Sequence, residues 1–478
     1  MRIYLTLILI ITFSTSFSQV GIGTTNPDPS SILELNSSSQ GLLTPRMTTA
    51  LRTAIDSPAE GLIVYDTDES SFYYYSSGTW IPLEGADIRN NYKLVKSVDD
   101  LSDELVAGGG SEYLLNTNFL YEINGEITFD FPVNINGAYI EGRDTGSDIL
   151  VNASGSTFFT GSNGGSLKTL RIEAGGQDLF NINGSGSQSV IAYTLIVNNA
   201  SSLGTLSNLY AVLFEILQVV NSNDGLTASD MTSFFMDKIF WTDSNSGTFL
   251  TLSGAFNNLQ IANGRIVSDS GETGIDVSAN PTINVSASIS QISFDGDGTR
   301  VNGYTADTYV GYNFTNDFYV ESPGIPVETD DNASGNFYFN GTLTTGFTQN
   351  ITNGTAVEVQ GTGTFASNGL FRFSVSNGGN RLNYEGFKSR EFKVNASLSV
   401  RVTSAAGNYY AFVIAKNGTI VTESNSVVYI QNDSQIQNVS LNANVNLEKD
   451  DYIEVYVQRL TGTGTDLLAV FSENLSIK

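Results

Sequence analysis

Residues 195–221 read LIVNNASSLGTLSNLYAVLFEILQVVN, and the two short apolar runs LIVN and VVN place Ile196 and Val219 23 residues apart. The spacing continues in both directions. Successive anchors are separated by 23, 24, 23, 20, 22 and 22 residues, and they are Ile149, Ile172, Ile196, Val219, Ile239, Ile261 and Ile283. Nearly constant spacing of this length is typical of a solenoid, in which each coil buries its apolar face on the next.

The residues between the anchors favour a right-handed parallel β-helix over residues 89–325. Short apolar runs alternate with Gly and Asn, which suits short strands joined by tight corners. We expect Ile172, Ile196, Val219 and Ile261 to point inward in one stack, with Asn ladders at the corners. Residues 210–220 (YAVLFEILQVV) could be helical, but their Val, Ile and Phe content favours a strand. A β-sandwich with irregular strands is the competing fold.

Residues 326–478 have a different rhythm. In residues 392–402 (FKVNASLSVRV) and 439–447 (VSLNANVNL), apolar and polar side chains alternate strictly. A period of two with one polar face is typical of an antiparallel sheet on a single core. The pair Asn417-Gly418 predicts a hairpin. The sequence therefore predicts an all-β chain whose C-terminal domain is an antiparallel jelly-roll β-sandwich.

The composition excludes several chemistries and partners. The 478-residue chain has 0 Cys and 0 His, which excludes thiol nucleophiles, disulfides, Ser-His-Asp triads and His- or Cys-ligated metals. Carboxylate, Lys, Arg and Tyr chemistry and oxygen-ligated calcium remain. The net charge of −27 makes a nucleic acid or an anionic membrane a poor partner. No stretch after the N-terminus approaches the roughly 18 apolar residues of a membrane span, so we expect no membrane insertion.

The N-terminus has the organisation of a secretory signal. Met1 and Arg2 precede the apolar run 3–13 (IYLTLILIITF), and small residues follow up to Ser18. We expect residues 1–18 to be removed and the mature chain to be secreted or held at a cell surface. Residues 19–88 form a separate attachment or capping segment, in which a short helix at 48–55 and a hairpin around Ser77-Gly78 are predicted.

Candidate metal and catalytic residues are few. Asp295 and Asp297 have the D-x-D-G spacing of a calcium loop, but a third ligand and a distal Glu are missing, and we expect no cofactor. Similarly, residues 243–247 (DSNSG) fit a coil corner better than a metal loop. We expect no catalytic residue.

Two acid sets could in principle act on a polysaccharide. Arg143, Asp144 and Asp148 have the residue types of β-helix lyases, and Asp269, Glu272 and Asp276 could supply paired carboxylates. A surface ion pair and a solvated face explain these sets as well. The aromatic residues 72–75 (FYYY) and Trp80 could stack on sugars, although a small core or a trimer seam explains them better.

The opening segment resembles a known family. Residues 20–27 (VGIGTTNP), 41–55 (GLLTPRMTTALRTAI), 57–68 (SPAEGLIVYDTD) and 72–83 (FYYYSSGTWIPL) follow the order seen in secreted surface proteins of Gram-negative bacteria, which are related in style to phage tail-fibre segments. This resemblance implies an exported, multidomain, fibre-like protein and no particular chemistry.

A second resemblance covers the C-terminal part. Residues 380–400 (NRLNYEGFKSREFKVNASLSV), 409–421 (YYAFVIAKNGTIV) and 445–477 are similar to the heads of phage tail and receptor-binding proteins, and residues 310–338 are similar to the neck that joins shaft and head. The head also resembles the trimeric jelly rolls of the C1q and tumour-necrosis-factor type. This resemblance implies a homotrimer with an attachment role.

Three functions fit these observations. The first is a trimeric adhesion or receptor-binding protein that binds a glycan or a cell-surface receptor without catalysis. The second is a tailspike-like lyase or glycosidase acting on an extracellular polysaccharide, and the third is a passive part of a surface appendage. Convergence of acids and Arg in one shaft groove would favour the enzyme over the binding protein.

Overall fold

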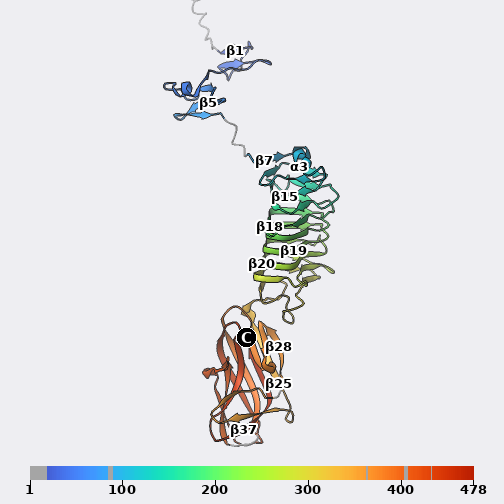
Figure 1. Cartoon of the computed structure of the whole chain (residues 1–478), viewed down its shortest axis with the longest axis vertical. Coiled ribbons are helices and arrows are strands. Elements are labelled where there is room, and N and C mark those ends of the chain that lie inside the picture. The colour runs from blue at the N-terminus through green and yellow to red at the C-terminus, as the bar shows by residue number, and fades with distance from the viewer. Residues whose placement is uncertain (1–18, 84–89, 362–363, 403–406, 432) are drawn as a thin grey trace, which may run out of the picture. The chain divides into compact units, whose positions relative to one another are not determined.

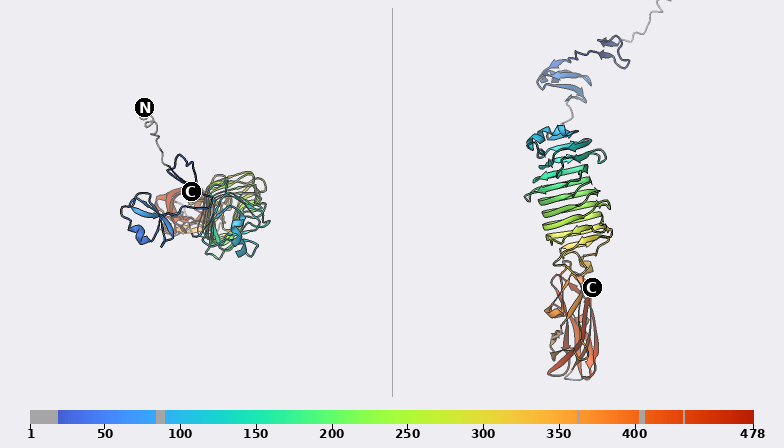
Figure 2. Two further views of the ribbon diagram at one scale, coloured as in Figure 1. Left: turned by 90° about the horizontal axis from the view of Figure 1, so that it is seen from above. Right: turned by 90° about the vertical axis from the view of Figure 1, so that its right-hand side faces the viewer.

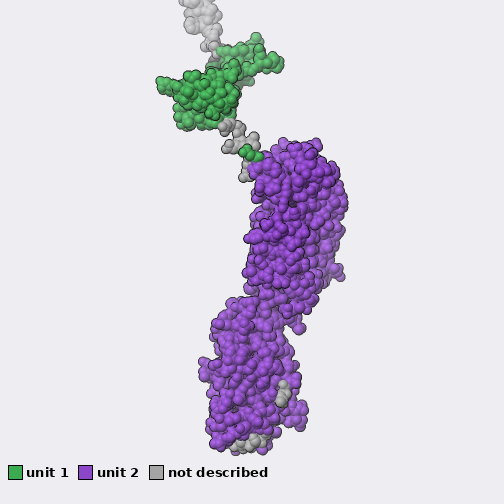
Figure 3. Space-filling model, viewed as in Figure 1, with its two compact units in different colours: residues 1–90 green, residues 91–478 purple. Residues whose placement is uncertain are grey.

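The computed structural model describes residues 19–83, 90–361, 364–402, 407–431 and 433–478, so the expected signal at 1–18 lies outside the described residues. The chain forms two compact units, residues 1–90 and residues 91–478 (Figure 3). Within the described residues, no helix is long and apolar enough to cross a membrane.

The first unit is built from short strands. β1 (Val20–Ile22) pairs in parallel with β2 (Leu33–Leu35). A separate sheet has the order β3-β4-β5-β6, with a parallel β3–β4 pair and antiparallel pairs after it. Its members are β3 (Arg46–Met47), β4 (Ile63–Asp66), β5 (Ser71–Ser76) and β6 (Thr79–Pro82), with helix α2 (Thr49–Thr53) between the first two.

The predicted local elements of this unit are present. Thr48 caps α2, because its side chain accepts a hydrogen bond from the backbone N–H of Leu51 at 3.4 Å. Ser77 and Gly78 both have positive φ values, as the tight turn between β5 and β6 requires.

The second unit begins with a parallel β-solenoid (Figures 1 and 2). One ladder runs the length of it through ten parallel strands. They are β7 (Tyr92–Val95), β9 (Leu120–Ile123), β12 (Tyr139–Glu141), β15 (Gly164–Glu173), β17 (Ser189–Asn198), β18 (Gly204–Val220), β19 (Leu226–Trp241), β20 (Thr248–Val267), β22 (Thr282–Asp295) and β24 (Phe318–Glu321).

Shorter strands complete the coils, and two helical turns lie at the start of the solenoid. The strands are β8 (Tyr113–Leu114), β10 (Glu126–Phe129), β11 (Val133–Asn134), β13 (Ile149–Asn152), β14 (Phe159–Gly161), β16 (Phe180–Asn183), β21 (Thr273–Asp276) and β23 (Thr299–Asn302). The turns are η1 (Val98–Leu101) and α3 (Ser102–Ala107). Leu101 belongs to the solenoid core, so this element covers the first coils.

Apolar side chains stack inward in aligned columns, and every member is buried. The column along the long ladder is Tyr121, Ile140, Leu167, Ala192, Phe214, Met236, Ile261, Ile289 and Val320. A second column is Leu150, Ile172, Val197, Val219, Trp241, Ile266 and Phe294. The solenoid and the strand at 210–220 are therefore confirmed.

The predicted single stack of Ile172, Ile196, Val219 and Ile261 is wrong. Ile172 and Val219 share a column with Val197, whereas Ile196 pairs with Arg171 and Gln218 on the outer, half-exposed side. Ile261 lies in the other column. A shift of one residue moves a strand side chain to the opposite face, so the spacing alone could not fix the register.

Variable coil length is the second reason for this error. Successive members of the first column are 19 residues apart from Tyr121 to Ile140 and 31 apart from Ile289 to Val320. Anchors chosen at a constant step therefore drift from one column to another.

Left-handed backbone residues mark the corners. One corner repeats coil after coil at Thr169, Thr194, Ile216, Lys238, Asn263 and Gln291, all with φ near +55°. The expected Asn ladders are present at other corners, because Asn221 Nδ2 donates to Asn198 Oδ1 at 2.8 Å and Asn208 Nδ2 donates to Asn183 Oδ1 at 2.7 Å. Asn tolerates positive φ better than other residues with a side chain, which explains its abundance here.

We predict that Val197→Asp destabilises the solenoid and that Ile196→Asp does not. Val197 is fully buried, so its replacement places an unpaired charge among apolar coils and costs several kcal/mol. Ile196 faces outward, and its replacement should cost about 1 kcal/mol or less. Thermal unfolding of the two soluble variants is the measurement. Equal losses, or a larger loss for Ile196→Asp, would contradict this register.

The second unit ends in an antiparallel β-sandwich with two sheets. One sheet contains β25 (Ser334–Asn340), β26 (Phe347–Thr352), β28 (Ala366–Phe371), β31 (Arg390–Val402), β35 (Gln437–Leu447) and β37 (Thr465–Ile477). The other contains β27 (Ala356–Glu358), β29 (Phe373–Ser376), β30 (Arg381–Tyr384), β32 (Asn408–Lys416), β33 (Thr419–Ile420), β34 (Ser426–Ile430) and β36 (Tyr452–Arg459). The short turns are η2 (Asp330–Asn332), η3 (Asn377–Gly379) and η4 (Thr422–Ser424).

The alternating sequences behave as predicted. The apolar members of 392–402 on β31 and of 439–447 on β35 all belong to the core between the sheets. The residues between them point outward, and on β35 they are exposed Asn and Ser.

Three carboxyl groups of this sandwich, Glu454, Asp466 and Glu473, are buried among the described residues, and burial raises the pKa of Glu454 and Glu473. Glu454 on β36 is held by Arg381, whose Nε lies 2.6 Å from Glu454 Oε2 and whose Nη2 lies 2.7 Å from Glu358 Oε2. Burial and hydrogen bonding with Glu358 raise the pKa of Glu454 to about 7, against the opposing effect of Arg381. Glu473 on β37 is 1% exposed, and neither carboxyl oxygen has a hydrogen-bond partner among the described residues. Burial raises the pKa of Glu473 well above its ordinary value.

We predict that the sandwich becomes more stable as the pH falls from 8 to 5. Because both folded pKa values lie above the unfolded value near 4.5, the folded state binds protons that the unfolded chain releases in this window. Glu473→Gln should raise the melting temperature at pH 8 by a few degrees and flatten its pH dependence. Glu391→Gln, at an exposed position on β31, is the control. A melting temperature that falls steadily from pH 8 to 5 would be inconsistent with these buried acids.

Candidate functional site

The first unit leaves an unusual amount of apolar surface uncovered. Val64 is its only buried apolar side chain among the described residues. The exposed ones include Ile32 at 80%, Leu43 at 78% and Leu42 at 64%. The full set is Val20, Ile22, Ile32, Leu33, Leu35, Leu42, Leu43, Leu51, Ile63, Phe72 and Leu83. Large apolar surface left open by one chain marks an interaction surface.

A buried ion pair organises the rest of this unit. Arg52 on α2 places its Nε 2.8 Å from Asp66 Oδ2 at the end of β4, and the two side chains are 7% and 0% exposed. The Arg52 guanidinium carbon lies 3.6 Å from the ring centroid of Tyr73 and 5.7 Å from that of Trp80. The aromatic hairpin therefore packs around Arg52, while Phe72 remains 40% exposed.

Asp66, the acidic partner of this pair, accepts hydrogen bonds on both of its carboxylate oxygens. Burial raises the pKa of Asp66, but hydrogen bonds from Arg52, Glu69, Thr49 and Asp68 outweigh that effect and lower it to about 2. Asp66 therefore stays charged at neutral pH, and it fixes α2 against the sheet.

We predict that Arg52→Leu opens the first unit without affecting the second. The variant leaves the Asp66 charge without its cation and removes the contact with Tyr73. Chymotrypsin should then cut within residues 72–75 while residues 91–478 stay intact. Arg143→Leu is the matched control, because the Arg143 side chain is 78% exposed in its pair with Glu122. Equal resistance of Arg52→Leu and the wild-type chain would contradict this role.

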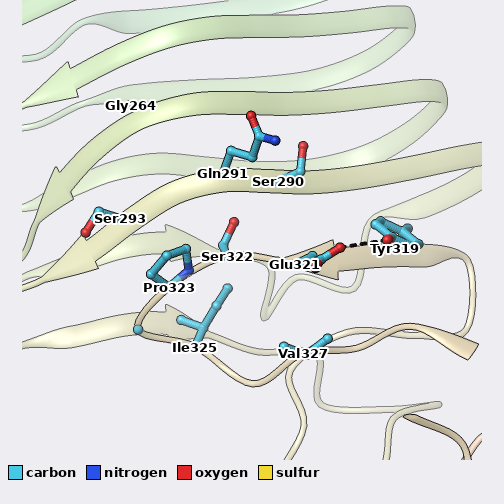
Figure 4. A pocket seen from close by; sticks show the side chains of 11 residues that line it. Gly264, Ser290, Gln291, Ser293, Tyr319, Glu321, Ser322, Pro323, Ile325 and Val327 are labelled. Atoms are coloured by element: carbon cyan, nitrogen blue, oxygen red, sulfur yellow. Dashed lines mark hydrogen bonds between the residues drawn. The ribbon is translucent and has the colours of Figure 1, made fainter. Parts of the chain in front are cut away.

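A large groove of the second unit lies on its last coils, and Gly264 of β20 contributes to its lining. It has a volume of about 920 Å³ and is lined by β22, β24 and the segment after β24. Figure 4 shows Ser290 and Gln291 on one strand above Tyr319 and Glu321 on the next. The Tyr319 hydroxyl donates to Glu321 Oε2 at 2.8 Å, and this hydrogen bond raises the pKa of Tyr319. Among the described residues that line this groove, Glu321 is the one carboxylate.

In the first predicted acid set, Asp148 is bonded to the backbone and Arg143 to another acid. Asp148 is buried and accepts hydrogen bonds from the backbone N–H groups of Gly125, Arg143 and Asp144 at 3.0, 2.6 and 3.0 Å. Burial raises the pKa of Asp148, but these hydrogen bonds outweigh it and lower the pKa. Asp148 thus shapes a corner, and Arg143 turns away to pair with Glu122 at 2.8 Å.

The second acid set is divided between two turns. Glu272 Oε2 accepts from the Asp269 backbone N–H at 2.8 Å. Asp276 accepts from the Ser278 hydroxyl at 2.7 Å and from Asn302 Nδ2 at 3.1 Å. Glu272 is thus bonded within its own turn and Asp276 also to the next coil, and the set forms no metal-binding group among the described residues.

The calcium candidate is occupied by protein groups. Asp295 Oδ2 lies 2.7 Å from Arg265 Nε and accepts from the Ser293 hydroxyl at 3.1 Å, while Asp297 is exposed. In the other weak loop, Asn245 is buried and donates to the carbonyl of Val219 at 2.8 Å, as a corner residue does. No group of three or more acids suited to a metal ion occurs in the described part of the chain.

Sequence reasoning missed the residues that join solenoid and sandwich. Arg372 is 2% exposed, and its guanidinium donates to Asn316 Oδ1 at 2.6 Å and to the Phe318 carbonyl at 2.7 Å. Tyr312 stacks on Phe371 with ring centroids 4.0 Å apart. Arg372 lies 56 residues after Asn316 and 54 after Phe318, so no local sequence pattern linked them. The resemblance to the neck of phage proteins did include residues 310–338.

Comparison with known proteins finds one family match, in the N-terminal part of the chain. Residues 21–96 match the family described as a phage tail like trimerisation region. These residues contain nearly all of the exposed apolar side chains of the first unit. Among curated proteins, none matches the chain.

Three solved structures to which the chain is similar are distant likenesses. The enzymatically active domain of bacteriophage CBA120 tailspike protein 4 is 11% identical, covers 91% of this chain and 77% of its own, and has a TM-score of 0.27. Eiger TNF from S. frugiperda is 11% identical, covers 30% of this chain and 92% of its own, and has a TM-score of 0.20. Rabbit GITRL, also 11% identical, covers 30% and 92% with a TM-score of 0.18. Likenesses at these scores carry no functional argument.

Proposed function

We propose that this chain is a trimeric, tail-fibre-type attachment protein that binds a glycan or a cell-surface receptor outside the cell, without catalysis and without a cofactor. The observation that carries the proposal is the coincidence of the trimerisation match at 21–96 with the uncovered apolar side chains of that segment. A single chain leaves Ile32 and Leu43 in water, and three chains can cover them.

The energetics support association through this segment. Each square ångström of apolar surface removed from water contributes about 25 cal/mol, and a closed cyclic trimer avoids open-ended growth. The charge of −27 on each chain opposes association, but physiological salt screens charges beyond about 8 Å. The head resemblance also implies a homotrimer, and the family match supports association through the N-terminal segment.

The absence of catalysis is supported by the arrangement of the acids. Within the described residues, Asp148 and Glu272 of the two predicted acid sets are bonded to backbone N–H groups of their own turns, and the groove of about 920 Å³ on the last coils has a single carboxylate. The smaller grooves beside it are lined by several carboxylates, so this argument applies to the shaft. A glycosidase places two carboxyl groups about 5–10 Å apart across its substrate. Binding therefore fits the shaft better than polysaccharide cleavage.

Light scattering on the full chain tests the trimer. We expect a three-chain mass at micromolar concentration and moderate salt. Ile32→Asp combined with Leu43→Asp should lower the mass to that of one chain, because charges would replace apolar contacts. Val106→Asp is the matched control, since Val106 on α3 is 80% exposed like Ile32 but lies outside the matched segment.

Two results would contradict the proposal. One is a one-chain mass for the wild-type protein, and the other is a three-chain mass that survives the double substitution. A one-chain mass for Val106→Asp would indicate that the contact between copies includes residues outside 21–96.

A further inference from the structure

Four grooves of the second unit meet where the solenoid ends and the sandwich begins, a region called the neck here (residues 280–331 with 385–388 and 449–450). Their volumes are about 920, 320, 290 and 450 Å³. Tyr319 lines the first two, Asn316 and Asp317 line the last three, and Phe387 lines the second and the fourth. Shared walls make the grooves neighbours, so an extended ligand can lie across more than one of them.

Exposed apolar side chains lie along these grooves. Phe387 is 56% exposed and Tyr319 is 47% exposed. Val285 and Val327, at 69% and 40%, line the same grooves. An open aromatic ring offers a flat surface to the C–H face of a sugar ring, and a Tyr hydroxyl or a side-chain amide beside it pairs with sugar hydroxyls. The lining also supplies such groups at Ser290, Gln291 and Asn316.

The walls are held in place before any ligand arrives. Asp330 Oδ2 accepts from the backbone N–H groups of Phe387 and Lys388, both at 2.8 Å, which fixes the loop that carries Phe387. The Arg372 guanidinium binds the Phe318 carbonyl at 2.7 Å and the Glu328 carbonyl at 3.2 Å, next to Tyr319. Because these walls are already ordered, less conformational entropy is lost when a ligand binds.

The charge of the neck restricts the ligand. The grooves are lined by seven carboxylates and three cationic side chains. Lys388 pairs with Asp331 at 2.8 Å, and the Lys449 ammonium lies 4.1 Å from the Phe387 ring centroid. Asp307, Asp317 and Glu321 have no ion-pair partner among the described residues. A ligand with carboxylate, sulfate or phosphate groups would be repelled.

We infer that the neck is the ligand site of this attachment protein and that it binds an extended glycan segment without acidic groups, neutral or amine-bearing, across the rings of Tyr319 and Phe387. The inference rests on the proposed function. It places recognition at the junction of the two domains and not along the middle of the shaft.

A glycan array tests the ligand class with the full chain. The array carries neutral, amine-bearing and acid-bearing oligosaccharides, including chitosan hexamers, N-acetylated chitin hexamers and polygalacturonate hexamers. We expect binding among the first two classes and at least tenfold weaker binding to the third. Equal or stronger binding of acidic glycans, or no binding of any acid-free glycan, would overturn the inference.

Calorimetry with the strongest acid-free glycan tests the site. Tyr319→Ala and Phe387→Ala, which change side chains on separate elements, should each weaken binding at least tenfold. Tyr210→Ala is the matched control, because Tyr210 on β18 is 53% exposed and lies away from the neck, and it should bind within threefold of wild type. Affinity unchanged in both neck variants would refute the site.

The mass of the same samples separates this inference from the proposed function. A three-chain mass together with undiminished binding by the neck variants overturns the neck alone. A one-chain mass for the wild-type chain overturns the proposed function whatever the calorimetry shows.

Discussion

Burial of apolar side chains by neighbouring backbone coils is the constraint on which the second unit depends. Each coil covers the column of the coil before it, and the residues of both columns are almost completely buried. Such a stack has two ends that need cover. Leu101 and the helix after it close the first end, and the Tyr312–Phe371 stacking and the buried Arg372 join the last coil to the sandwich. The neck therefore covers the end of the solenoid with the sandwich.

The first unit does not satisfy the same constraint by itself. Its short strands surround the Arg52–Asp66 pair and leave apolar side chains such as Ile32 and Leu43 in water. The match of residues 21–96 to a trimerisation region is the basis for our proposal that other copies of the chain cover these side chains. We therefore propose that association of three copies completes an apolar core that one chain cannot build.

Much of the fold could be predicted from the sequence, and the reasons for success and failure are physical. Strict alternation in 392–402 and 439–447 specifies which side chains face the core, because period two has only two faces. The spacing near 22 residues specifies a solenoid but not its columns, since coil lengths vary and Ile196 is one residue away from the inward Val197. The neck grooves could not be predicted from the sequence, because Tyr319 and Phe387 are far apart in the chain and line the same groove only in the folded structure. Whether the acid sets converge could not be predicted from the sequence, and in the structure Asp148 and Glu272 bond to backbone N–H groups of their own turns.

The most direct test of the central claim is the solvent accessibility of the N-terminal apolar side chains in the assembled protein. Hydroxyl-radical footprinting of the full chain measures the modification rate of Ile32 and Leu43 relative to Val106, after correction for the intrinsic reactivity of each residue type. In a single chain the three are 80%, 78% and 80% exposed. If other copies cover residues 21–96, Ile32 and Leu43 should be modified several-fold more slowly than Val106. Equal corrected rates at a concentration where the chain is assembled would contradict the account.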